Sequence, residues 1–310
     1  MKNVLEWLEA TVAKYPDKPA FSDTESSITF RQVYDIARNT GAYLVEQLGV
    51  DRTPVAVFAG RKMVTPAYFL GVVYAGRPYA PIDASLPDKR IEKILENLCP
   101  RAIVADRESR EHVESIVDEL AKAEGFDRPQ IFIAEDISHF EQVACADSNC
   151  KISESSGDAV TDSENDTDGG VVAGCAGKTD DSALEKLATV RRQMSMTDPL
   201  YIIYTSGSTG NPKGVMTSHL SLMTYINAYC DVMHIEESDV LGNQSPLDYI
   251  AAIRDIYLPL KTGCSTAIIP KEYFMEPNAL FDYMNDKKVS SVGWSVSAFT
   301  ILTSLGAFEE

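Results

Sequence analysis

Short apolar runs of strand length alternate with segments of helical periodicity over the first 134 residues. In the helical segments, apolar side chains recur every three or four positions, as on one face of a helix. The segments follow in the order helix 31–47, run 54–59, helix 65–74, run 79–83, helix 88–98, run 102–105 and run 130–134. Strands that alternate with helices favour mostly parallel sheets with helices on both faces. The sequence therefore predicts the α/β class.

This alternation disappears between residues 136 and 182. From Glu135 to Glu185 the chain holds 13 acidic residues against two basic ones, so this stretch carries −11 of the total formal charge of −18. A polar, acidic segment with almost no aromatic residues buries too little apolar surface to offset the entropy lost on ordering. We therefore expect a disordered acidic insertion at 136–182, between a first α/β subdomain at 1–135 and a second at 183–310.

Composition excludes several classes of partner. No apolar run approaches the roughly 18–20 residues needed to span a membrane, and no basic patch is present that would neutralise phosphates. Neither a membrane nor a nucleic acid is expected. The six cysteines show no zinc-type spacing and the N-terminus does not resemble a signal peptide, which favours free thiols in the cytoplasm.

A loop rich in glycine and hydroxyl side chains follows the apolar run Leu200–Tyr204. Glycine lets backbone N–H groups converge on an anion, the hydroxyls add donors, and Lys213 adds a positive charge. Because this loop follows a strand, where open α/β sheets bind ligands, it predicts a polyphosphate cradle. It is not a Walker A loop, because no Ser or Thr follows the lysine. The predicted contacts are Thr205, Ser206, Gly207, Ser208, Thr209, Gly210 and Lys213.

The pattern of strands and helices resumes after this loop. Ser218 can cap a helix that begins at His219 and runs to Met233, where we expect His219 to pack at the helix N-terminus. Further strands are predicted at 241–244, 266–269 and 289–292, and helices at 277–287 and 297–305.

The stretch Tyr201–His219 resembles the signature of the AMP-binding, adenylate-forming superfamily. Ile28–Val33 and Gly71–Asp83 resemble its first two core motifs. The ending Pro81-Ile-Asp83 is more similar to amino-acid adenylation domains of peptide synthetases, or to D-alanine–carrier ligases, than to fatty acyl-CoA synthetases. The resemblance covers nearly the whole chain except the acidic segment, and it implies the large N-terminal domain of that fold.

The resemblance implies an acid–thiol ligase that joins a carboxylic acid, in this subgroup an amino acid, to ATP. The acyl-AMP formed would pass to the phosphopantetheine thiol of a carrier protein or of CoA. By resemblance, the loop from Thr205 to Lys213 holds the β- and γ-phosphates, and Lys213 is the catalytic residue. Positioned donors, cations and Mg²⁺ stabilise the charge that develops as pyrophosphate leaves.

The substrate pocket is implied by the stretch Gly242–Leu260, which resembles a family segment containing an aspartate that anchors an α-amino group. Two registers are open. In the first, Ile250 replaces that aspartate, and a carboxylic acid without a free α-amine is favoured; in the second, Asp248 takes the role or is solvated. The first register lines the pocket with Ile250, Ala251, Arg254 and Gly293. An ion pair between Arg254 and Asp255 is the structural alternative.

Later family motifs do not occur up to Glu310: a Tyr-Gly-Pro-Thr-Glu stretch near adenine and magnesium, a ribose-binding aspartate, and a C-terminal domain with a catalytic lysine. We therefore expect a partial domain that is inactive alone, with the main protein ligand of Mg²⁺ beyond the C-terminus. The alternatives are a fragment of an acyl- or aryl-CoA ligase, and a non-catalytic nucleotide-binding or assembly module.

Overall fold

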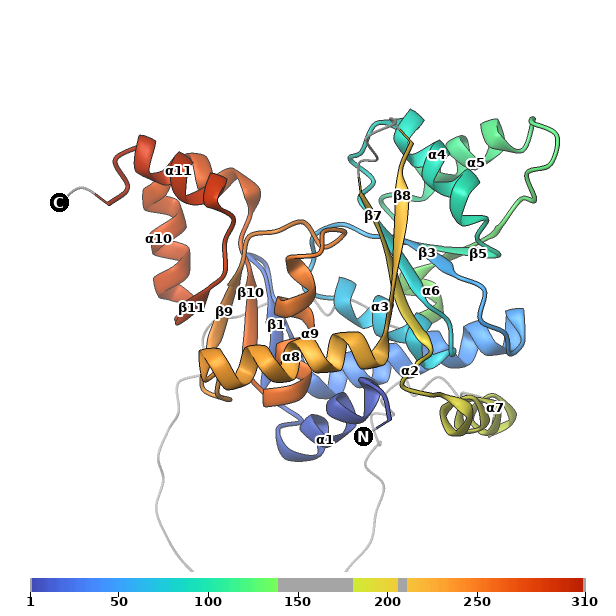
Figure 1. The fold of residues 1–310 in the computed structure, drawn as a ribbon, viewed down its shortest axis with the longest axis horizontal. Coiled ribbons are helices and arrows are strands. Elements are labelled where there is room, and N and C mark those ends of the chain that lie inside the picture. The colour runs from blue at the N-terminus through green and yellow to red at the C-terminus, as the bar shows by residue number, and fades with distance from the viewer. Residues whose placement is uncertain (1, 139–180, 206–210, 309–310) are drawn as a thin grey trace, which may run out of the picture.

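The computed structural model describes residues 2–138, 181–205 and 211–308, and the statements below concern these residues. They form two sheets flanked by helices (Figure 1), so the predicted α/β class is confirmed. None of the helices in these ranges is long and apolar enough to cross a membrane.

One sheet has six strands in the order β6-β5-β3-β4-β7-β8, parallel except for the antiparallel pair β7–β8. Its strands are β3 Val55–Phe58, β4 Tyr79–Ile82, β5 Ala102–Ala105, β6 Gln130–Ile133, β7 Pro199–Thr205 and β8 Lys213–Ser218. The other has five strands in the order β11-β9-β10-β1-β2, parallel except for β1–β2. Its strands are β1 Pro19–Ser22, β2 Ser27–Thr29, β9 Val240–Asn243, β10 Ser265–Ile268 and β11 Ser291–Val292.

The helices enclose both sheets. They are α1 Leu5–Lys14, α2 Phe30–Leu48, α3 Thr65–Tyr74, α4 Asp88–Leu98, α5 Arg110–Leu120, α6 Ala134–Ser138, α7 Asp181–Gln193, α8 His219–Met233, α9 Ala252–Thr262, the 3₁₀ turn η1 Lys271–Met275, α10 Pro277–Asp286 and α11 Val296–Ser304. Several begin with a local signal. In α2, for example, the Thr29 hydroxyl accepts from the N–H of Gln32, and the Gln32 side chain accepts from the N–H of Thr29.

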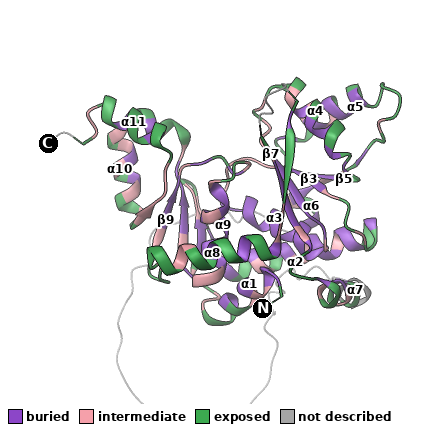
Figure 2. Ribbon diagram, viewed as in Figure 1, coloured by how far each residue is buried: buried purple, intermediate pink, exposed green. Residues whose placement is uncertain are grey.

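Alternate side chains of each sheet pack on different helices, because successive residues of a strand point to opposite faces. In β3, Val55 and Val57 join the central core with α1, α2 and α3, whereas Ala56 and Phe58 pack with α4 and α5. In the five-stranded sheet, Phe21 belongs to the central core, while other side chains pack under α10 and α11. The buried surfaces therefore lie on both faces of each sheet (Figure 2).

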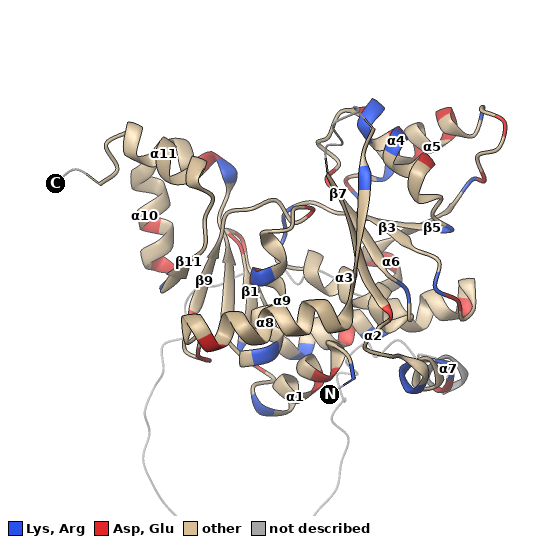
Figure 3. Ribbon diagram, viewed as in Figure 1, with Lys and Arg blue, Asp and Glu red and all other residues tan. Residues whose placement is uncertain are grey.

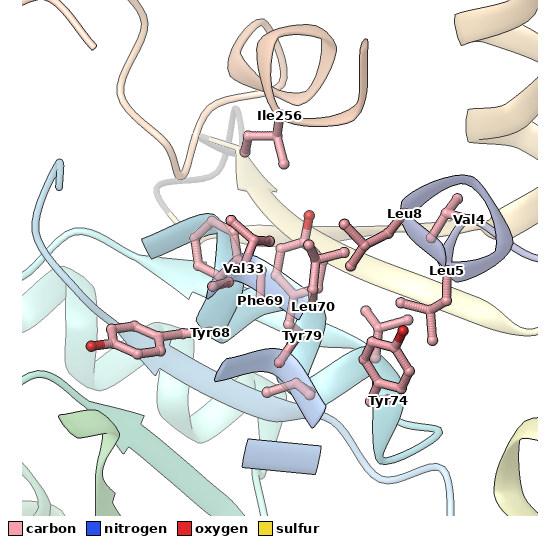
Figure 4. Close-up of a cluster of buried hydrophobic side chains, with 14 of the residues drawn as sticks. Val4, Leu5, Leu8, Val33, Tyr68, Phe69, Leu70, Tyr74, Tyr79 and Ile256 are labelled. Carbon is pink, nitrogen blue, oxygen red and sulfur yellow. The ribbon is translucent and has the colours of Figure 1, made fainter. Parts of the chain in front are cut away.

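The central core joins the two sheets. Figure 4 shows side chains of α1, α2, α3 and β4 converging there, among them Val33, Phe69 and Tyr79. The helices α2 and α3 approach closely at Gly41 and Gly71. A Cβ atom on Gly71 would lie 2.5 Å from the Cβ of Thr40, and one on Gly41 would lie 2.6 Å from the Cβ of Tyr74. Only glycine permits this crossing.

The sheets do not follow the predicted division of the chain at residues 136–182. The first strands, β1 and β2, pair in the sheet of β9, β10 and β11, and β7 and β8 complete the sheet of β3–β6. Each sheet thus combines strands from both sides of the acidic segment. Residues 136–138 end α6 and residues 181–182 begin α7, while 139–180, where we predict disorder, lie outside the described residues.

Candidate functional site

The predicted phosphate loop joins the two strands of the β7–β8 hairpin. Apolar residues of β7 are buried in the sheet, and the strand ends at the exposed residue Thr205. Thr205 pairs with Lys213, the first residue of β8, and the Thr205 hydroxyl lies 3.5 Å from the Lys213 carbonyl oxygen. Tyr204 donates a hydrogen bond of 2.9 Å to Asn97, which ties the end of β7 to α4. The two ends of the loop are therefore fixed to each other and to the sheet.

The intervening residues Ser206, Gly207, Ser208, Thr209 and Gly210 lie outside the described residues. Thr205 and Lys213 are both exposed at the carboxyl end of β7, beside the parallel strand β4. In the described part of the chain, Lys213 forms no ion pair, so its charge is available to an anion. A hydroxyl and an ammonium group at the carboxyl end of a strand fit a polyphosphate.

The described residues also bear on whether this site could hold a metal ion. Among them, no group of three or more His, Cys, Asp or Glu side chains is arranged to hold a metal ion. Acidic and basic residues alternate along the described ribbon in Figure 3, with neither kind gathered on one element. The described residues thus hold no complete set of metal ligands, and phosphate binding by Thr205 and Lys213 stays a prediction.

Two of the predicted pocket residues lie in contact. Arg254, on the first turn of α9, donates from Nη2 to the carbonyl oxygen of Gly293 at 2.8 Å, just after β11. Its Nε donates to Asp255 at 2.7 Å, so the alternative of an Arg254–Asp255 ion pair is confirmed. Burial lowers the pKa of Arg254, but the Asp255 carboxylate more than offsets this effect and raises it overall. The guanidinium is therefore charged.

The other pocket positions lie near the start of α9. Ile250 and Ala251 directly precede the helix, and Ile250 is 52% exposed. Asp248 lines a separate recess with Asp83 that has a volume of about 10 Å³, room for one water at most. Burial raises the pKa of Asp248, and the charge of Asp83 raises it further. The roles assigned to these residues from sequence stay predictions.

A polar network that continues from Asp255 to Asn243 and Arg61 was not anticipated from the sequence. The Asp255 carboxylate also accepts from the side-chain amide of Asn243 at 3.0 Å, and Arg61 donates to the Asn243 side-chain oxygen at 2.9 Å. Arg61 follows β3 and Asn243 ends β9, so the network links the carboxyl ends of strands in both sheets. The only signal in the sequence is that polar residues follow two apolar strands.

The side chain of His219 is buried at the start of α8. His219 is the first residue of α8, where the Ser218 hydroxyl accepts from the N–H of Ser221 as predicted. Its side chain is 1% exposed, and its Nδ1 lies 3.5 Å from the N–H of Val4. These contacts agree with a packing role at the helix N-terminus.

A large open cavity of about 1670 Å³ lies between the two sheets. Its walls come from α2, α3, α6, the β1–β2 turn and the segments that follow β3, β4, β5, β9 and β10. Acids outnumber bases among its lining residues, and Arg61 is the member that also belongs to the network. None of the predicted phosphate or pocket residues is among the residues that line it.

The chain is similar to known enzymes over most of its length. The model of the family described as AMP-binding enzyme matches residues 8–310. A D-alanine–D-alanyl carrier protein ligase of Bacillus licheniformis is 26% identical over 284 residues, which are 90% of this chain and 46% of that protein. The corresponding ligase of Bacillus velezensis is 25% identical over 89% of this chain and 44% of its own length. The chain thus spans about half the length of these curated relatives.

Solved structures share the fold. The nonribosomal peptide synthetase FmoA3 superposes with a TM-score of 0.71 at 18% identity, covering 99% of this chain and 27% of that one. The four-domain synthetase AB3403, bound to AMP and glycine, gives a TM-score of 0.69 at 18% identity over 97% of this chain and 18% of its own. The N-terminal domain of FACL13 from Mycobacterium tuberculosis gives 0.70 at 18% identity, over 100% of this chain and 67% of that one.

The resemblance inferred from the loop after β7 and from the two earlier motifs is therefore confirmed by a family match that covers nearly the whole sequence. This chain belongs to the AMP-binding enzyme family.

Proposed function

We propose that this protein serves in the ATP-dependent activation of a carboxylic acid as acyl-AMP, for transfer to a phosphopantetheine thiol. The observation that carries the proposal is the β7–β8 hairpin, which presents Thr205 and Lys213 beside each other at the carboxyl end of a buried strand. The related ligases named for D-alanine and its carrier protein support an amino acid as substrate and a carrier protein as acceptor.

In this proposal the loop binds the polyphosphate of ATP. The Thr205 hydroxyl donates to a phosphate oxygen, and the Lys213 ammonium balances negative charge on the β- and γ-phosphates. Their placement at a fixed hairpin end orients the α-phosphorus toward the acid, which lowers the entropy cost of reaction. Mg²⁺ would supply further charge stabilisation when bound, and the described residues hold no complete ligand set for it. Because the reaction uses ATP and a reduced thiol, we propose the cytoplasm as its location.

The test is a calorimetric titration of the purified protein with ATP, comparing the native sequence with Lys213→Gln. We expect the substitution to weaken ATP binding by about tenfold or more, since it removes a charge-assisted contact. Lys122→Gln is the matched control, because Lys122 is an exposed lysine that pairs with Glu119 near the end of α5. Equal ATP affinity of native protein and Lys213→Gln, or no binding at millimolar ATP, would contradict the proposal.

A second measurement separates an enzyme from a nucleotide-binding module. Pyrophosphate–ATP exchange dependent on a carboxylic acid reports adenylate formation directly. From the absence of the later motifs within the sequence, we expect no exchange above background for the 310 residues alone. Exchange above background would show that this expectation is wrong and that the chain is sufficient for the first half-reaction.

A further inference from the structure

The guanidinium of Arg254 is held in one orientation. Its Nε and Nη2 face the two carboxylate oxygens of Asp255 at 2.7 and 3.3 Å, and Nη2 also donates to the Gly293 carbonyl oxygen at 2.8 Å. The Cζ atom of the group lies over the Tyr229 ring, 5.5 Å from its centre. The side chain is 12% exposed. A group pinned by a bidentate carboxylate, a carbonyl and an aromatic ring is preorganised for recognition.

Gly293 leaves the space that this orientation requires. A Cβ atom at this position would lie 2.3 Å from both Cζ and Nη1 of Arg254, well inside van der Waals contact. Any other residue would displace the guanidinium. The guanidinium of Arg254 thus occupies the space that a side chain at position 293 would fill. Its Nη1 lies at the end of β11. Within the described residues Nη1 has no hydrogen-bond acceptor, so two of its N–H donors are free.

The hydrogen-bonded groups connected to Arg254 carry a net positive charge, which an anion could balance. Arg254 and Asp255 neutralise each other, and Asn243 links Asp255 to a second guanidinium, Arg61. In the part of the chain that the structure describes, Arg61 forms no ion pair. Burial lowers the pKa of Arg61, and the charges of Glu272 and Asp83 act to raise it. The hydrogen-bonded network Arg254–Asp255–Asn243–Arg61 therefore carries a net charge of +1. A carboxylate on Nη1 would bring it to zero.

We propose that Arg254 is a specificity-determining residue and that the acid this protein activates carries a second carboxylate, which binds Nη1. The inference rests on the proposed function and on the resemblance of Gly242–Leu260 to the family segment that binds the acid, which implies a place for Arg254 in the acid pocket. In the first register Ile250 stands where an amine-binding aspartate would, so the acid would lack a free α-amine, in contrast to the D-alanine of the related ligases. The purely structural alternative is that the Arg254–Asp255 pair only fastens α9 to the end of β11.

The experiment compares acids that differ in one charge and little in shape. Succinate, glutarate and adipate, each beside its monoamide, are titrated into the native protein with a non-hydrolysable ATP analogue present. We expect at least one diacid to bind about tenfold or more tightly than its monoamide, because only the diacid forms a charge-assisted pair with Arg254. Arg254→Gln should reduce that preference to about threefold or less.

Arg191→Gln is the matched control. Arg191 is also partly buried, pairs with Glu9 at 2.9 Å and lies 5.5 Å from the centre of the Tyr74 ring, but it belongs to α7. Its replacement should leave the diacid preference unchanged. If Arg254→Gln fails to fold, Gly293→Ala takes its place: a Cβ at 2.3 Å from Nη1 would displace the guanidinium, so the diacid preference should fall in that variant too.

Three results would overturn the proposal: equal binding of diacid and monoamide, binding of no acid in the panel, or an unchanged preference in Arg254→Gln. The same titration without acid separates the two proposals. If the ATP analogue binds and no diacid preference appears, the specificity inference is wrong and the proposed function stands. If the analogue does not bind, the proposed function itself fails.

Discussion

The neutral state of His219 makes the stability of this protein depend on pH. The imidazole is 1% exposed at the start of α8, where it contacts the N–H of Val4. Burial lowers its pKa from 6.5 to about 4; the nearby Asp198 acts to raise it and Arg191 to lower it. A buried histidine of this kind is neutral when folded and takes up a proton only at a substantial cost.

The sign and size of the effect follow from the two pKa values. Below pH 6.5 the unfolded chain binds a proton that the folded chain does not, so protonation favours unfolding. The contribution of His219 is fully present above pH 6.5 and is lost progressively as the pH falls to about 4. At about 1.4 kcal/mol for each pH unit, the loss amounts to about 3 kcal/mol. That is a large share of the roughly 5–15 kcal/mol that stabilises a typical domain.

The assay is urea unfolding of the native protein and of His219→Asn at several pH values between 7 and 4. Asn is chosen because its side-chain oxygen can accept from Val4 as Nδ1 does. Carboxylates titrate in both proteins, so only the difference between their unfolding free energies reports His219. This difference should shift by about 3 kcal/mol against the native protein as the pH falls. His112→Asn, on the exposed side of α5, controls for loss of a surface histidine. A pH-independent difference for His219→Asn would refute the reasoning.

Two further substitutions test the packing of the fold. Gly71→Ala should destabilise the protein by about 1–3 kcal/mol, because a Cβ would lie 2.5 Å from a side-chain atom of α2; Gly60→Ala, with its nearest atom at 3.5 Å, should cost less in the same thermal melts. Arg77→Met should cost about 3–5 kcal/mol in urea unfolding, because Arg77 is fully buried and pairs with Asp51. Arg101→Met, which removes an exposed partner of the same Asp51, should cost less than about 1 kcal/mol, and equal losses would contradict the argument.

The elements with strong local signals could be predicted from the sequence. α3 and α4 occupy the predicted ranges 65–74 and 88–98, and α8 runs from His219 to Met233 as the Ser218 cap predicts. α5 carried an equally clear apolar spacing over Arg110–Leu120 but was not anticipated. α9 was not anticipated either, and it contains Pro259, a residue type that usually ends or interrupts a helix.

Sheet membership could not be predicted in the same way. β1 is four residues long and pairs in parallel with β10, so that Phe21 lies opposite Thr266. The two strands lie far apart in the sequence, so the local residue pattern of neither strand indicates that they pair. β8 was missed because it is an edge strand whose first four residues are exposed, so it lacks the alternation of a half-buried strand. For these reasons the predicted split at the acidic segment does not match the two sheets.

The candidate site shows the same limit at the level of side chains. The sequence placed Arg254 and Gly293 in one pocket by resemblance, and the hydrogen bond between them is consistent with that placement. It gave no sign of Asn243 and Arg61, because their connection to Asp255 depends on strands from two sheets ending side by side. Residue type indicates which groups can form a charge network, whereas only the topology decides which of them meet.

Asp255 connects Arg254 to strands of both sheets. Asp255 fixes Arg254, and its backbone carbonyl oxygen also accepts from the Thr266 hydroxyl on β10 at 2.6 Å. Through Asn243, the same carboxylate is tied to the end of β3 in the other sheet. Removing Asp255 would therefore leave Arg254 without its carboxylate partner and the Asn243 amide without its acceptor, at a cost expected to exceed that of losing Arg254 alone. On the proposed function, substitutions at positions 254 and 293 would alter the acid pocket, whereas the contacts Asp255–Asn243–Arg61 that join the two sheets would stay in place.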